Sequence, residues 1–203
     1  PFTRMLAGPA DYTPGVFNFD NPVQPNTRVH ATLANQLGLF VTMYSPLQMA
    51  CDLPENYMKH PAEFQFIRDV PCDWEQSRLL SGEIGKYLVM ARQDRHSADW
   101  YIGAVNDDTP RNITLDWSFL FDGDAETTSP NRDTAHTNRD TAHTNRVYTA
   151  QIYRDAPDAD WQTNPYATLI DTLQITVTSA LLTLRLASGG GFAIRLVPVS
   201  DKQ

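Results

Sequence analysis

The spacing of hydrophobic residues changes near residue 78, from a helical period to a period of two. Before that point, residues 28–44 place apolar side chains on one face of a helix, with Thr27 suited to begin it and Pro46 suited to end it. A mostly apolar run follows at residues 46–51, and a second helical pattern follows at residues 61–70. The pattern predicts a helix, a buried strand and a helix, in that order.

Shorter signals flank these elements. Pro54 and Pro61 each suit the first turn of a helix, residues 9–13 favour a short strand, and residues 1–8 favour the end of a helix. Strands that alternate with helices are typical of βα units beside a parallel sheet.

The second part of the chain contains short runs rich in β-branched and aromatic residues, separated by Asp, Asn, Gly and Pro. This pattern predicts an antiparallel sandwich or barrel. A glycine triplet at 189–191 favours a hairpin between the last two strands. The predicted strands are residues 87–92, 100–105, 113–119, 147–153, 173–177, 181–186 and 192–197.

The chain therefore divides into residues 1–77 and residues 78–203, with an exposed loop at about 122–146. That loop contains two identical heptads, RDTAHTN, at 132–145, which indicates an insertion in a tolerant loop. A metal site at His136 and His143 is the alternative, although no recognised ligand spacing accompanies them.

Composition narrows the classes of function. With 41% hydrophobic residues and a net charge of −8, the 203-residue chain is typical of a globular protein that binds neither nucleic acid nor a membrane surface. No run is long and apolar enough for a spanning helix. Cys51 and Cys72 are expected to be buried free thiols. The missing initiator Met and leader suggest part of a longer chain.

Carboxylates are the main source of candidate chemistry, because no nucleophile elbow, phosphate loop or zinc motif occurs. Asp11 and Asp52 each fall at the carboxyl end of a predicted strand, where barrel active sites are built. Asp11 also suits a turn, and Asp52 also suits a helix N-cap. The acidic stretch 154–161 suggests a calcium or sugar site, or else a turn-rich loop on which Trp161 packs.

Several long motifs resemble glycoside hydrolase family 97, which contains α-glucosidases and α-galactosidases. They occur in the same order as in the family and cover nearly the whole chain: PFTRMLAGPADYTPG at 1–15, QLGLFVTMYSPLQMA at 36–50, DLPENY at 52–57, FQFIRDV at 64–70, YRDAPDADW at 153–161 and GGGFAI at 189–194.

The resemblance implies the last quarter of an enzyme with a β-sandwich, a (β/α)8 barrel and a C-terminal β-domain. Residues 1–77 would be the last βα units of the barrel, and residues 78–203 an antiparallel β-sandwich domain. It implies hydrolysis of α-glycosidic bonds by two carboxyl groups. The catalytic carboxylates and the calcium ligands of the family would lie upstream, so no catalytic residue and no metal is expected in this chain.

The same resemblance implies a periplasmic enzyme with an oligosaccharide or α-glycoside substrate and contacts to upstream domains of its own chain. Asp11, Tyr12 and Asp52 are then the best-placed substrate-binding residues. The alternative is a non-catalytic β-sandwich that binds carbohydrate or docks a partner domain, with an exposed Trp100 or Trp161 stacking on a sugar.

Overall fold

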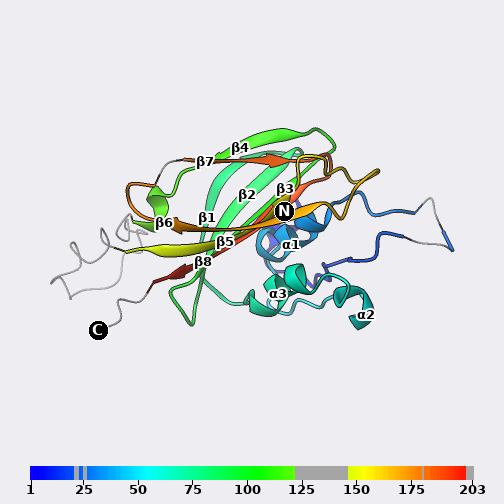
Figure 1. Ribbon diagram of the computed structural model, residues 1–203. Helices are drawn as coiled ribbons and strands as arrows, with labels where there is room; N and C mark the ends of the chain where they lie inside the picture. Colours follow the sequence, from blue (N-terminus) through cyan, green and yellow to red (C-terminus); the bar gives the residue numbers. More distant parts are fainter. Residues whose placement is uncertain (21–22, 25–26, 122–145, 180, 200–203) are drawn as a thin grey trace.

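The computed structural model describes residues 1–20, 23–24, 27–121, 146–179 and 181–199. A six-stranded antiparallel sheet, in the order β1-β2-β3-β8-β5-β6, forms its centre (Figure 1). Two other strands, β4 (Arg111–Leu115) and β7 (Leu182–Leu186), pair with each other in a second, smaller sheet. The central strands are β1 (Trp74–Glu83), β2 (Tyr87–Asp94), β3 (Trp100–Asn106), β5 (Tyr148–Asp155), β6 (Thr168–Ile175) and β8 (Gly191–Pro198).

The two faces of the large sheet bury separate hydrophobic cores. The β4–β7 sheet and the 3₁₀-helix η2 (Ser118–Leu120) cover one face, where Trp100, Ile152 and Ile194 are buried. Helices α1 (Leu33–Thr42) and α3 (Pro61–Asp69) cover part of the other face. Because side chains alternate across a strand, neighbouring residues of one strand supply both cores. The second core comprises Phe17, Phe19, Leu33, Leu37, Phe40, Val41, Tyr57, Phe66, Trp74, Tyr101, Tyr153 and Ala193.

Helix α1 lies unusually close to the large sheet because glycines meet at the contact. A Cβ atom on Gly38 would lie 2.3 Å from the carbonyl oxygen of Ala104, and one on Gly103 would lie 2.5 Å from the carbonyl oxygen of Gly38. Real Cβ atoms do not approach backbone this closely. The absence of side chains at these positions therefore sets the distance between the two layers.

The structure confirms an antiparallel β-fold in the second part of the chain, with three corrections. The predicted strand at 113–119 ends at Leu115 and continues into η2, and the one predicted at 173–177 is β6, which runs earlier over Thr168–Ile175. The glycine triplet does not close a hairpin, because β7 pairs with β4 whereas β8 pairs with β3 and β5. It carries the chain from one sheet to the other instead.

Strand β1 was not predicted. Only Trp74 is buried along its ten residues, and the remainder is half-buried or exposed. An edge strand of this kind lacks the alternating apolar signal on which strand prediction rests. It also extends the β-region to residue 74, before the predicted boundary at 78.

The first part of the chain is less regular than predicted. Helix α1 begins at Leu33, with Thr32 as its N-cap, rather than near Arg28. The two predicted parallel strands, at 9–13 and 46–51, are extended segments joined by one parallel bridge between Tyr12 and Gln48. Helix α2 (Pro54–Tyr57) and helix α3 begin at Pro54 and Pro61 as expected, and residues 4–7 form the 3₁₀-helix η1 (Arg4–Ala7).

Three further predictions concern single features. Both cysteines are free, but Cys51 is exposed and Cys72 is half-buried, so the expected burial was wrong. The duplicated heptad at 132–145, with His136 and His143, lies outside the described residues. Among the helices that the structure describes, none is long and apolar enough to cross a membrane.

Candidate functional site

Asp11 and Tyr12 belong to an extended segment that runs parallel to residues 44–51. Besides the Tyr12–Gln48 bridge, the N–H of Ala10 donates to the carbonyl of Tyr44 (3.4 Å) and the N–H of Cys51 donates to the carbonyl of Pro14 (3.1 Å). The two segments therefore end at the same place. Asp52, directly after the second segment, begins the loop at that end.

The loop after the first segment is held by side chains from α1 and α2. The Gln36 side-chain oxygen accepts the N–H groups of Gly15 (3.1 Å) and Val16 (3.0 Å). The Tyr57 hydroxyl donates to the Gly15 carbonyl (2.8 Å) and accepts the N–H of Asp52 (2.9 Å). Burial raises the pKa of this hydroxyl to about 12, so it stays protonated. Gly15 itself has φ +93°, which disfavours any other residue.

The Asp52 carboxylate is fully engaged in this loop. One oxygen accepts the N–H groups of Phe17 (2.7 Å) and Asn18 (2.6 Å), and the other accepts the N–H of Leu53 (2.8 Å) and the Asn56 amide (2.6 Å). Partial burial raises the pKa of Asp52, but these four hydrogen bonds outweigh that effect and lower it. The N-cap of α2 is Leu53. Asp52 therefore fastens the loop to the start of α2 without being its N-cap.

The other two predicted residues are less constrained. Asp11 is exposed and, within the described part of the chain, its side chain makes no hydrogen bond or ion pair. The side chain of Tyr12 is half-buried, and burial followed by the Cys51 thiol raises the pKa of its hydroxyl. Of the three candidates, Asp11 is the carboxylate that is available to a ligand.

Sequence reasoning did not single out the buried carboxylate of Asp155 at the end of β5. It is 1% exposed, and it accepts the Thr32 hydroxyl (2.7 Å) and the N–H groups of Ala187 and Gly191 (both 2.8 Å). Burial raises its pKa despite these hydrogen bonds. The Thr32 oxygen also accepts the N–H of Asn35 (3.2 Å), which fixes the start of α1. Asp155 thus joins α1, β5 and the turn into β8.

The rest of the acidic stretch 154–161 forms turns. One Asp160 oxygen accepts the N–H groups of Gln162 (2.8 Å) and Thr163 (3.1 Å). Trp161 is half-buried and stacks on His30, with 3.8 Å between ring centroids. These contacts support the interpretation of residues 154–161 as a turn-rich loop rather than as a calcium or sugar site. In the described residues, no group of three His, Cys, Asp or Glu side chains could hold a metal ion.

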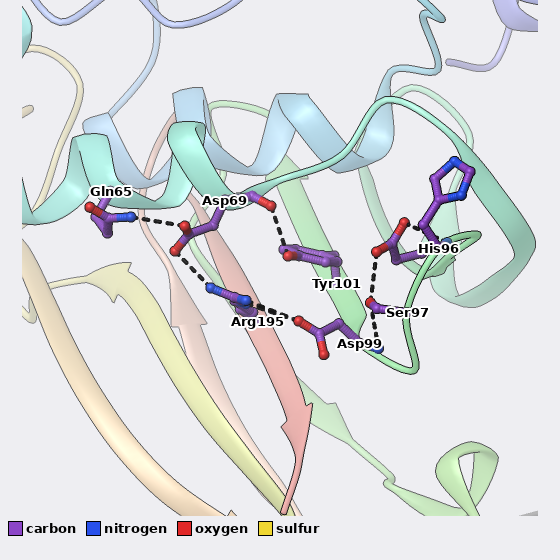
Figure 2. Close-up of polar contacts among 8 residues, drawn as sticks. Gln65, Asp69, His96, Ser97, Asp99, Tyr101 and Arg195 are labelled. Carbon is purple, nitrogen blue, oxygen red and sulfur yellow. Dashed lines mark hydrogen bonds and ion pairs between the residues drawn. The ribbon is translucent and has the colours of Figure 1, made fainter.

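A second polar cluster fastens α3 to the large sheet (Figure 2). Arg195 on β8 forms ion pairs with Asp69 of α3 (2.8 Å) and with Asp99 just before β3 (3.0 Å). The Tyr101 hydroxyl donates to the Asp69 carbonyl (2.9 Å), and Gln65 donates to the Asp69 carboxylate (2.8 Å). Burial raises the pKa of Tyr101. Both carboxylates are paired with Arg195, so the cluster holds α3 against the large sheet and leaves neither carboxylate free for acid–base chemistry.

The comparisons with known proteins identify the class of protein. The family model "Glycosyl-hydrolase 97 C-terminal, oligomerisation" matches residues 73–146 and 125–197, and the overlap contains the duplicated heptad. A retaining α-galactosidase of Bacteroides thetaiotaomicron is 31% identical over 97% of this chain and 26% of its own length. A probable retaining α-galactosidase of Streptomyces bingchenggensis is 38% identical over 52% of this chain and 15% of its own length.

Solved structures agree with this classification. A glycoside hydrolase family 97 enzyme from Pseudoalteromonas sp. strain K8, solved in complex with panose and with acarbose, is 42% identical, with a TM-score of 0.81 over 97% of this chain and 27% of its own. The chain belongs to glycoside hydrolase family 97, and it corresponds to the C-terminal portion. It spans about a quarter of the Bacteroides relative and of the solved Pseudoalteromonas enzyme.

Proposed function

We propose that this chain is the C-terminal part of an enzyme that hydrolyses α-glycosidic bonds in α-galactosides or α-glucosides. Residues 1–77 would complete its (β/α)8 barrel, and residues 78–203 would form an accessory β-domain. The observation that carries the proposal is the agreement over 97% of the chain with a 42% identical enzyme of this family. The parallel pairing of Tyr12 with Gln48 supports the barrel assignment, because barrel strands are parallel.

The chemistry would use two carboxyl groups upstream of this chain, one as the acid and one as the base or nucleophile. The calcium ion of the family would also be bound upstream, and the enzyme would be periplasmic. Within this chain, Asp11 and Tyr12 would contact the substrate directly at the end of the paired segments. Asp52 would act more as a support for the neighbouring loop, because its four hydrogen bonds occupy both oxygens.

The Asp11→Ala change in the complete enzyme tests this assignment. We expect kcat/KM on an aryl α-glycoside to fall at least about tenfold with an unchanged melting temperature, because a hydrogen bond to a charged group contributes about 1.5–3 kcal/mol. Asp108→Ala provides the control, since Asp108 is an exposed carboxylate in the β-domain. Kinetics that match this control would remove Asp11 from the substrate site.

The alternative proposal is a non-catalytic docking module, and the word "oligomerisation" in the family description favours docking over sugar binding. Trp100 cannot stack on a sugar as we had expected, because it is 4% exposed and packs edge-on against Phe119. Trp161 already has His30 stacked on one ring face. Docking and hydrolysis are compatible within one longer enzyme.

A further inference from the structure

The loop that follows the first paired segment, residues 15–19, has no regular secondary structure, yet each of its backbone N–H groups donates to a side chain. Gln36 accepts the first two of these groups, and Asp52 accepts the next two. The last, the N–H of Phe19, donates to the hydroxyl of Tyr166 at 2.9 Å. Because surface loops can give these groups to water instead, such complete pairing indicates a loop with a fixed position.

Tyr166 differs from the other two acceptors because it belongs to the β-domain, in the connection between β5 and β6. It lies 147 residues from Phe19 in the sequence. Its ring packs against the ring of Phe19 and stacks on His60, with 5.1 Å between ring centroids in each pair. Burial raises the pKa of its hydroxyl, which therefore stays protonated and neutral. The β-domain thus supplies one of the three side chains that hold the loop.

The connection that carries Tyr166 is itself fastened to the start of α1. The N–H of Leu33 donates to the carbonyl of Pro165 (2.8 Å), and the N–H of Ala156 donates to the carbonyl of Ala167 (2.9 Å). Tyr166 lies between these two carbonyls. Its backbone is therefore held in place, as a residue that orients a neighbouring loop requires.

The loop at residues 15–19 presents a polar side chain beside the candidate site. Phe17 and Phe19 are 1% and 3% exposed and anchor the loop in the second core, whereas Asn18 between them is exposed. The N–H of Asn18 donates to Asp52 at 2.6 Å, which places Asn18 next to the end of the paired segments. A side-chain amide can both donate to and accept from hydroxyl groups, which are the groups that a sugar offers.

We propose that Tyr166 is a positioning residue for the substrate site, and that it holds residues 15–19 so that Asn18 contacts a sugar hydroxyl of the α-glycoside. The inference rests on the proposed function, which places the substrate at this end of the paired segments. It gives the β-domain a part in substrate binding, beyond the oligomerisation that the family description names. Because the loop is already fixed, substrate binding does not have to order it.

Steady-state kinetics of the complete enzyme on an aryl α-glycoside, combined with hydrogen exchange, test the inference. Tyr166→Phe keeps the aromatic ring and removes only the hydroxyl. We expect KM to rise about two- to tenfold with kcat nearly unchanged, because contacts made equally in the ground state and the transition state affect KM alone. Exchange of a peptide that contains residues 15–20 should become faster, because the Phe19 N–H loses its acceptor.

Two further variants distinguish positioning from a purely structural role. Tyr87→Phe removes a hydroxyl that is hydrogen-bonded to Ser81 (2.9 Å) elsewhere in the β-domain. This matched control should keep the wild-type KM and the wild-type exchange of residues 15–20. Asn18→Ala should itself raise KM, and adding Tyr166→Phe to it should raise KM no further, because Tyr166 acts through Asn18.

A wild-type KM or wild-type loop exchange in Tyr166→Phe would overturn the inference. An equal rise in KM in Tyr87→Phe, or a double variant in which the two effects on KM multiply, would overturn it as well. A complete enzyme that hydrolyses no α-glycoside would instead refute the proposed function. The exchange measurement needs no substrate, so it shows independently whether Tyr166 holds the loop.

Discussion

The buried Asp155 carboxylate offers the sharpest test of how the helical layer is joined to the sheet. In the Asp155→Ala variant, the N–H groups of Ala187 and Gly191 and the buried Thr32 hydroxyl all lose their acceptor. A buried donor left unsatisfied costs about 1–3 kcal/mol. Relief from burying a carboxylate offsets part of this cost. We expect a net loss of about 2–4 kcal/mol in the free energy of unfolding.

Such a loss lowers the melting temperature by roughly 5–15 °C in a chain of this size. Urea and thermal unfolding followed by circular dichroism measure it. The matched control is Asp158→Ala, because Asp158 is an exposed carboxylate three residues away that accepts one bond from Asn164 (2.9 Å). That control should stay within about 0.5 kcal/mol of the wild type. Equal stability of the two variants would refute the reasoning.

The loss in Asp155→Ala should also depend on pH in a definite direction. Burial raises the folded-state pKa of Asp155 above the ordinary value of 3.8, so the folded state binds more protons just above pH 3.8. The contribution of Asp155 is therefore fully present below pH 3.8 and declines as pH rises through the folded-state pKa. The difference between wild type and variant should be larger at acidic pH than at neutral pH.

Three further changes test other contacts. Gly38→Ala should destabilise the chain by about 1–3 kcal/mol, because its Cβ would lie 2.3 Å from the Ala104 carbonyl oxygen. The control Gly82→Ala, whose Cβ would lie 3.4 Å from its nearest neighbour, should melt at nearly the wild-type temperature. In Asp52→Asn, the free energy of unfolding should fall less steeply below pH 3.8 than in the wild type. The reason is that the lowered folded-state pKa of Asp52 makes the wild type lose stability as the pH falls. The same pH dependence in both proteins, measured by urea unfolding, would contradict this. Tyr57→Phe should cost about 1–2 kcal/mol in chemical unfolding through two lost hydrogen bonds, and a neutral result would contradict their assignment.

Strands buried on both faces could be predicted from the sequence, because their apolar runs record burial directly. The predictions for β2, β3, β5 and β8 rest on such runs, and the structure has strands there. Edge strand β1 was not predicted, because only Trp74 is buried along it and its sequence therefore has no apolar run. The start of α1 was misplaced because Thr32 is fixed by Asp155, a contact 123 residues away that no local pattern encodes.

The sequence indicated where Asp11 and Asp52 lie in the fold, but it did not indicate the contacts that each residue makes. Asp11 lies within one of the two paired extended segments, and Asp52 directly follows the other. Only the folded geometry distinguishes the exposed Asp11 from Asp52, because one Asp52 oxygen accepts two backbone N–H groups that lie 34 and 35 residues away in the sequence. Asp155 gave no separate signal, because an acidic residue in a turn-rich stretch looks the same whether it is exposed or buried.

The central proposal is that this chain completes an α-glycoside hydrolase whose catalytic carboxylates would lie upstream of it. The most direct measurement is the initial rate of hydrolysis of aryl α-galactosides and α-glucosides by the complete enzyme and by the purified 203-residue chain. We predict turnover of at least one of these substrates by the complete enzyme and none by the chain alone. Turnover by the purified chain, or a complete enzyme inactive on both substrates, would contradict the account.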